Sequence, residues 1–211
     1  MKAKLISITQ AANMTPEQLI VYTARVSNPE NQHNTETSDR LISYLIKNKH
    51  WSPFEMVDMT VEIVTSRAIA QQILRHRSFS FQEFSQRYSK ATGIESINLR
   101  YKGKTNRQSS ESLADLEDQL YFGQKIESLI AQSQELYNAM IDNDIARECA
   151  RMILPLATQT TLYMKGSVRS WIHYLQIRCD EHTQLEHREI ADEIKNIFTE
   201  KFPNISKALN F

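Results

Sequence analysis

Cationic and aromatic side chains are concentrated between residues 74 and 90, in the sequence LRHRSFSFQEFSQRYSK. The cationic side chains are those of Arg75, His76, Arg77, Arg87 and Lys90, the aromatic ones are those of Phe79, Phe81, Phe84 and Tyr88, and the only acid is Glu83. Arginine binds phosphate or carboxylate oxygens through paired hydrogen bonds, and aromatic rings pack against planar groups. The segment therefore indicates either a solvated basic face or a binding site for an anionic, planar molecule.

Two further arginines occupy positions where the pattern favours an aliphatic residue. Arg178 continues the apolar stripe of a helix predicted from Ser167, and Arg151 lies within the sequence CARMILPL. A buried arginine needs an anion or a carboxylate as its partner. For Arg151 this partner is either Glu148, three residues earlier, or a ligand. Arg178 either extends to solvent at the negative end of its helix dipole or contacts a ligand.

Other kinds of chemistry have less support in the sequence. The chain has four glycines and contains neither GxGxxG nor GxxxxGKS/T, which argues against a dinucleotide fingerprint and a P-loop. His182 and His187 are five residues apart, whereas a helical zinc pair is four apart, so no metal site is predicted. Cys149 and Cys179 form no CxxC pair, and Glu148 disfavours a thiolate at Cys149, so neither cysteine is predicted to be a nucleophile.

The composition limits the class of protein. A chain of 211 residues is long enough for one domain with a hydrophobic core. Lysine and arginine together number 25, as do aspartate and glutamate, and this zero net charge disfavours a duplex nucleic-acid binder. No apolar run approaches the roughly 20 residues of a membrane span, and the first residues lack a signal-peptide core. We therefore predict a cytoplasmic protein with no nucleic-acid or membrane partner.

Apolar periodicity predicts the elements that position these side chains. Strands are predicted over residues 4–8, 57–63 and 158–166. Helices are predicted over residues 15–26, 38–48, 66–74, 113–141, 145–154, 167–178 and 183–202. The helix over residues 15–26 begins with a predicted capping box in the sequence TPEQ. The inward residues of the longest helix are predicted to include Leu116, Leu120, Ile126, Leu129 and Ile130. Residues 92–112 are polar and contain two glycines, which predicts a flexible loop or lid. The predicted fold is α+β, a helix-rich single domain over residues 1–211 with a small sheet.

Several motifs together resemble the signature of the flavin-dependent thymidylate synthases. RHR at residues 75–77, followed after seven residues by Ser85 and then by Arg87 and Tyr88, is similar to the central motif of that family. The other similar segments are ARVSNP at residues 24–29, HWSPFE at 50–55, ARMILP at 150–155 and VRSWIHYLQIRCDEH at 168–182. The resemblance covers most of the chain in the right order, and residues 92–112 contribute nothing to it.

The resemblance implies an activity and an assembly. Enzymes of this family make dTMP from dUMP, with 5,10-methylenetetrahydrofolate as the carbon donor and NADPH as the source of electrons, passed through FAD. They use no cysteine nucleophile, which agrees with the settings of the two cysteines. The implied fold is the α+β fold of the thymidylate synthase-complementing proteins, and the implied assembly is a homotetramer whose active sites are shared between chains.

The resemblance also implies roles for individual residues. The FAD-binding residues would be Ser52, Arg75, His76, Arg77, Ser78, Glu83, Arg169, His173, Ile177 and His182. The dUMP-binding residues would be Gln72, Arg75, Glu83, Ser85, Gln86, Arg87, Arg151 and Arg178. Arg178 would be the catalytic residue, which contacts the uracil and stabilises negative charge at its N3–C4–O4 edge.

Some positions depart from the common family pattern. Gln82 and Gln86 stand where asparagine and glycine are common, Ser167 and His173 replace two asparagines, and Met56 replaces a histidine. These departures concern individual flavin and nucleotide contacts and leave the implied reaction unchanged.

Two other classes of function remain as alternatives. One is a nucleic-acid-binding module that uses residues 75–90 as a basic and aromatic surface. The other is a flavin-dependent NADPH oxidase with a different acceptor. A steep salt dependence would favour the first, and an absence of dUMP binding would favour the second.

Overall fold

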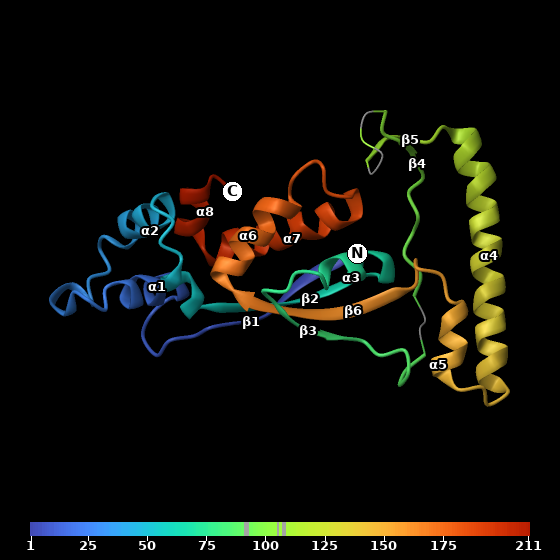
Figure 1. Cartoon of the computed structure of the whole chain (residues 1–211), viewed down its shortest axis with the longest axis horizontal. Helices are drawn as coiled ribbons and strands as arrows, with labels where there is room; N and C mark the ends of the chain where they lie inside the picture. The colour runs from blue at the N-terminus through green and yellow to red at the C-terminus, as the bar shows by residue number, and fades with distance from the viewer. Residues whose placement is uncertain (91–92, 105, 107–108) are drawn as a thin grey trace. The chain divides into compact units, whose positions relative to one another are not determined.

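The computed structural model describes residues 1–90, 93–104, 106 and 109–211 (Figure 1). Contacts within the chain form two compact units. Unit 1 comprises Met1–Ile63, Leu74–Gln82 and Leu162–Phe211, and unit 2 comprises Val64–Ile73 and Glu83–Thr161. The single domain over residues 1–211 stays a prediction.

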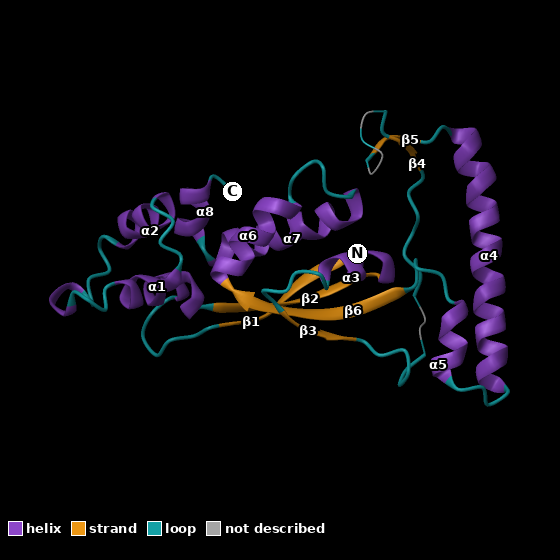
Figure 2. Cartoon of the chain, viewed as in Figure 1, coloured by secondary structure: helices purple, strands orange, loops and turns teal. Residues whose placement is uncertain are grey.

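The described chain is rich in helices and has a small sheet, which confirms the α+β fold class (Figure 2). The strands are β1 (Lys2–Ile8), β2 (Asp58–Ser66), β3 (Ser80–Glu83), β4 (Arg100–Lys102), β5 (Ser110–Leu113) and β6 (Gln159–Ser167). The helices are α1 (Pro16–Ala24), α2 (Ser38–Lys47), α3 (Arg67–Ile73), α4 (Leu116–Asp142), α5 (Arg147–Ala150), α6 (Val168–Arg178), α7 (Leu185–Lys201) and α8 (Pro203–Leu209), with 3-10 turns at Pro29–Asn31, Ser52–Met56 and Arg151–Ile153. None of these helices is both long and apolar enough to cross a lipid bilayer.

The core of unit 1 forms between the sheet and the helices that cover it. Four strands pair in the order β1-β2-β6-β3, and α6 and α7 lie on one side of them (Figure 2). Met59 and Val61 of β2 are buried, as the alternation of apolar and polar residues along that strand predicts, and Leu162 and Met164 of β6 are buried as well. The indole N–H of Trp171, on α6, donates to the carbonyl oxygen of Met59 at 3.0 Å, which satisfies its polar atom inside the core.

The start of α1 follows directly from its sequence. The Thr15 hydroxyl accepts a hydrogen bond from the backbone N–H of Gln18 at 3.2 Å, and the Gln18 side-chain oxygen accepts one from the backbone N–H of Thr15 at 2.8 Å. The predicted capping box is therefore confirmed. The helix ends at Ala24 rather than at residue 26.

Gly166, near the end of β6, permits a close approach of an aromatic ring. A Cβ at this position would lie 2.5 and 2.6 Å from the Cδ1 and Cε1 atoms of Phe79. The Phe79 ring packs edge-on against Trp171, with centroids 4.7 Å apart. The absent side chain of Gly166 thus gives Phe79 its place against the backbone of β6.

In unit 2, α4 does not bury the face that its sequence predicts to be inward. Leu116, Leu120 and Leu129 are 71%, 57% and 67% exposed, and Tyr137 is the only residue of α4 that is buried. The contacts of α4 with α5 and with the Arg151–Ile153 turn leave these leucines uncovered. The inward-face prediction is therefore wrong for these leucines within a single chain, because the apolar pattern shows that a face favours burial but not what covers it.

Residues 92–112 are not a continuous loop. Thr92, Thr105, Arg107 and Gln108 lie outside the described residues. In the remainder, β4 and β5 pair antiparallel, with Arg100 opposite Leu113 and Lys102 opposite Ser110. The flexibility and the lid role of this segment stay predictions.

Other element boundaries differ from their predictions. The predicted helix over residues 145–154 consists of α5 followed by a 3-10 turn, and the predicted helix over 183–202 is followed by a separate helix, α8. Pro203 explains the second boundary, because proline disfavours continuation of a helix but suits the first turn of the next. The short strand β3, within the basic and aromatic segment, was not predicted.

Candidate functional site

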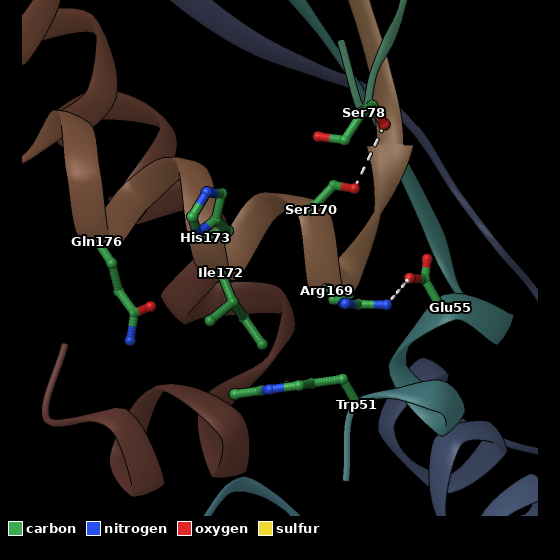
Figure 3. A pocket seen from close by; sticks show the side chains of 8 residues that line it. All are labelled: Trp51, Glu55, Ser78, Arg169, Ser170, Ile172, His173 and Gln176. Atoms are coloured by element: carbon green, nitrogen blue, oxygen red, sulfur yellow. Dashed lines mark hydrogen bonds and ion pairs between the residues drawn. The ribbon is translucent and has the colours of Figure 1, made fainter. Parts of the chain in front are cut away.

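A cavity of about 460 Å³ in unit 1 is formed by the first turns of α6, the Ser52–Met56 turn and the residues before β3 (Figure 3). Its lining residues are Trp51, Glu55, Ser78, Arg169, Ser170, Ile172, His173 and Gln176. Three of them, Ser78, Arg169 and His173, were predicted from the resemblance to bind FAD. The structure therefore brings together residues that are about 90 positions apart in the chain.

Arg169 is held in this cavity by a carboxylate. Its Nη1 donates to the Glu55 Oε1 at 2.9 Å (Figure 3). The Glu55 Oε2 accepts from the Ser167 hydroxyl at 2.5 Å. Ser167 also caps α6 by accepting from the backbone N–H of Ser170 at 3.3 Å. Because the ion pair is largely exposed, it contributes little to stability. Its effect is to orient a guanidinium beside the N-terminus of α6, where backbone N–H groups favour an anion.

One face of α6 carries three of the predicted flavin residues. Arg169, His173 and Ile177 are spaced four residues apart and are all exposed. The hydroxyl of Ser170, on the adjoining face, donates to the carbonyl oxygen of Ser78 at 3.3 Å and so ties the segment before β3 to the helix. A polar and apolar strip of this kind suits a long ligand with both charged and flat parts.

The sequence prediction missed five of the eight lining residues: Trp51, Glu55, Ser170, Ile172 and Gln176. Trp51 belongs to the HWSPFE motif and directly precedes Ser52, a predicted FAD-binding residue. An aromatic residue next to Ser52 was the feature that could have indicated Trp51. Gln176 lies one turn after His173 on α6, and helical spacing was the only signal for it. In Figure 3 the ring of Trp51 is seen edge-on, beneath the side chain of Ile172 in this view.

Arg178 and His76, also in unit 1, form a direct contact. The Nε of Arg178 donates to the Nε2 of His76 at 2.9 Å. Burial, together with the positive charges of Arg178 and His173, lowers the pKa of His76 to about 4. His76 is therefore neutral near pH 7 and accepts a hydrogen bond from a permanently charged arginine.

The other predicted residues of unit 1 are exposed on connecting segments. Arg75 and Arg77 flank His76, and Ser52 begins a 3-10 turn. His182 follows α6, and its Nδ1 lies 2.7 Å from the Oδ1 of Asp180. This hydrogen bond raises the pKa of His182 above its usual value and thus favours its cationic form.

The predicted nucleotide residues are distributed over the two units. Arg75 and Arg178 belong to unit 1, and the rest of the set belongs to unit 2: Gln72, Glu83, Ser85, Gln86, Arg87 and Arg151. Glu83 lies 3.3 Å from the Nη1 of Arg67 and accepts from the Thr160 hydroxyl at 3.0 Å. These contacts hold the Glu83 carboxylate at the end of β3.

Glu148 is not the partner of Arg151. Its Oε2 lies 3.0 Å from the Nη2 of Arg87, in an exposed ion pair. Within the described part of the chain, the buried Nε of Arg151 and the buried Nε2 of Gln86 have no hydrogen-bond partner. Buried donors are normally satisfied by protein, water or ligand. Both atoms therefore suit a ligand with acceptor oxygens, and the carboxylate alternative for Arg151 is wrong.

Cys179 does not have the setting of a nucleophile. Burial, assisted by a hydrogen bond to Asp192, raises the pKa of Cys179 to about 12, so its thiol stays protonated. Cys149 is exposed on α5. Among the described residues, no three or more His, Cys, Asp or Glu side chains gather as a metal ion would require.

Comparison with known proteins gives consistent matches along the chain. The family model described as thymidylate synthase complementing protein matches residues 5–204. A probable flavin-dependent thymidylate synthase from Paramecium bursaria Chlorella virus 1 is 50% identical over 216 aligned positions, which cover 100% of both chains. A flavin-dependent thymidylate synthase from Synechocystis sp. is 50% identical over 217 positions, also with full coverage of both.

A solved structure is similar in fold. The UMP/dUMP methylase PolB from Streptomyces cacaoi, bound with 5-Br dUMP, superposes with a TM-score of 0.87 at 25% sequence identity. The superposition covers 99% of this chain and 94% of the methylase chain.

Proposed function

We infer, since this chain belongs to the thymidylate synthase complementing protein family, that it is a flavin-dependent thymidylate synthase. Its reaction is the reductive methylation of dUMP to dTMP, with FAD as cofactor, 5,10-methylenetetrahydrofolate as carbon donor and NADPH as reductant. The observation that carries this inference is the 50% identity with two curated flavin-dependent thymidylate synthases over the full chain. The nucleic-acid module and the oxidase with another acceptor have no support among these relatives.

The cavity of unit 1 fits a part of FAD. Arg169 uses one nitrogen for Glu55 and retains donors for the diphosphate, while Trp51 and His173 provide flat rings. We propose that Ser78, Arg169 and His173 hold FAD here, and that the other predicted residues, Ser52 among them, also contact it. When bound, FAD supplies the two-electron chemistry of the reaction, and the chain supplies position and field.

The dUMP residues act through charge and hydrogen bonding. A nucleoside monophosphate carries about two negative charges, which suit the guanidinium groups of Arg75 and Arg87. The unsatisfied donors of Gln86 and Arg151 support their assignment to the phosphate and sugar. Arg178 places a fixed positive charge at the pyrimidine edge, which favours electron density at C5, the carbon to be methylated.

We propose that the enzyme acts as a cytoplasmic homotetramer with active sites shared between chains. The exposed leucines of α4 support an assembly, because an apolar strip of this kind favours burial against another surface. The two cysteines, which form no disulfide, support a reducing compartment.

The purified protein should be yellow, or should become so with FAD, and NADPH should bleach it. Arg169→Ala should weaken FAD binding about tenfold, because it removes a hydrogen bond from a charged donor. FAD titrations followed by visible absorbance and flavin fluorescence would measure both effects. Lys165→Ala is the matched control, since Lys165 also lies in unit 1 but pairs with Asp58. A colourless protein that ignores added FAD would contradict the proposed function.

A double variant, Cys149→Ser with Cys179→Ser, should keep at least half of the rate of dTMP formation. The raised pKa of Cys179 leaves no thiolate there for nucleophilic attack. Product formation from labelled dUMP would measure the rate. If a folded, FAD-bound double variant makes no dTMP, a thiol takes part in the reaction and our assignment is wrong.

A further inference from the structure

The hydrogen bond between Arg178 and His76 fixes the chemical state of both side chains. A guanidinium nitrogen is always a donor, so the Nε2 of His76 must present its lone pair and the ring proton must be on Nδ1. Within the described part of the chain, this is the only hydrogen bond of Arg178. The two terminal nitrogens of its planar fork therefore remain available to a ligand.

Aromatic rings hold His76 in this orientation. Its ring packs edge-on against Tyr174, with centroids 4.9 Å apart and planes at 76°. Phe79 and His187 also meet it edge-on, at 6.4 and 6.3 Å. With packing on three sides, rotation of the imidazole would displace neighbouring rings, and close-packed interiors resist such displacement.

Tyr174 and His187, whose rings both contact that of His76, form a buried polar pair. Tyr174 and His187 are both fully buried, and the Tyr174 hydroxyl lies 3.1 Å from the Nε2 of His187. Burial raises the pKa of Tyr174 and lowers that of His187 to about 3, so the hydroxyl keeps its proton and the imidazole stays neutral. A neutral, satisfied pair of this kind stabilises one arrangement of the rings.

The groups that face His76 also maintain its neutral form. From α6 these are Arg178, Tyr174 and His173, and from α7 it is His187. None of them carries a negative charge near neutral pH, so none favours the imidazolium, which cannot accept from Arg178.

We propose that His76 is a positioning residue for Arg178, and that the buried Tyr174–His187 pair fixes the His76 ring for this role. The inference rests on the proposed function, in which Arg178 contacts the uracil. The hydrogen bond at Nε sets the direction of the two terminal nitrogens of Arg178, because the guanidinium group is planar and rigid. Any contact of His76 with FAD would then use Nδ1, the nitrogen that Arg178 leaves free.

A double-mutant cycle tests the role of His76. His76→Phe keeps a ring of similar size but loses the acceptor, and it should lower kcat for dTMP formation about tenfold, the effect of one hydrogen bond to a charged group. In the Arg178→Ala background the same change should have almost no effect, because its partner is gone. His76→Gln should recover part of the loss, since its amide oxygen can accept from Arg178.

Arg169→Ala serves as the matched control in this cycle. Arg169 and Arg178 are nine residues apart on α6, roughly 13 Å along the helix. The losses in kcat from Arg169→Ala and Arg178→Ala should therefore multiply when the two substitutions are combined. His187→Phe should act like a weaker His76→Phe, about threefold, and its effect should likewise vanish when Arg178 is alanine. All rates are compared at saturating FAD, because His76 is also one of the residues proposed to contact FAD. His76→Phe should melt close to wild type, whereas His187→Phe should melt at a lower temperature, because it leaves the buried Tyr174 hydroxyl without its partner.

Two results would overturn the positioning role. One is a His76→Phe loss that persists undiminished in the Arg178→Ala background. The other is a loss that appears only as weaker FAD binding and disappears at saturating FAD, which would limit His76 to its proposed contact with FAD. The same cycle measured as dUMP affinity by calorimetry decides the matter even if the wild type makes no dTMP, which would instead contradict the proposed function.

Discussion

Replacing Arg178 by alanine should lower dTMP formation about 100-fold, roughly 3 kcal/mol of transition-state stabilisation, while FAD remains bound. The reason is that a charge placed in advance at the uracil edge acts without reorganisation when electron density develops on the ring. The rate from labelled dUMP, measured at saturating FAD and dUMP, would give the loss in kcat.

Lysine at position 178 should restore only part of this activity. It retains the charge but lacks the planar fork and the Nε donor that His76 accepts. Arg188→Ala is the matched control, because Arg188 lies on α7 and donates to the carbonyl oxygen of Glu181. It should leave the rate near wild type. A near-normal rate in Arg178→Ala would instead return Arg178 to the simple role of a cation at a helix end.

Two inactive variants should restore activity when they are combined in one oligomer. We propose that Arg151 and Arg178 reach one nucleotide from different chains, so each homo-oligomer of Arg151→Ala or Arg178→Ala lacks one arginine at every site. In mixed oligomers, one kind of site collects both substitutions and another collects neither. With equal expression and random mixing, about a quarter of the sites should be intact, giving a rate far above the sum of the parents.

The measurement needs two affinity tags, so that only hetero-oligomers are assayed. Arg178→Ala carrying both tags is the matched control, because all of its sites lack the same arginine and cannot be complemented. Hetero-oligomers that bind FAD but are as inactive as their parents would show that both arginines serve the site of one chain, and the shared-site proposal would be wrong.

Elements whose signals are local could be predicted from the sequence. The capping box at Thr15 and the alternation of β2 depend on residues within a few positions of one another. The strand β3 could not be predicted, because Ser80–Glu83 has little apolar character of its own and gains its partner, β6, only when distant segments meet. The prediction of the inward face of α4 failed for a related reason, since the described residues leave its leucines exposed.

The candidate site was predictable in its charges but not in its contacts. The cluster of arginines indicated an anion, and the motifs indicated which anion. No pattern in the sequence indicated that Glu55 orients Arg169, or that His76 accepts a hydrogen bond from Arg178, 102 positions away along the chain. Trp51 was overlooked because its place in the cavity depends on how the Ser52–Met56 turn packs against α6.

The contact between Gly166 and Phe79 restricts how this sequence can drift. Even a methyl group at position 166 would strike the Phe79 ring, which is itself wedged against Trp171. A larger residue at position 166 is therefore tolerable only after a smaller residue has replaced Phe79, so the order of the two substitutions matters. Since Phe79 also borders His76, this epistasis ties the evolution of a glycine in a strand to the orientation of the arginine that we assign to the uracil.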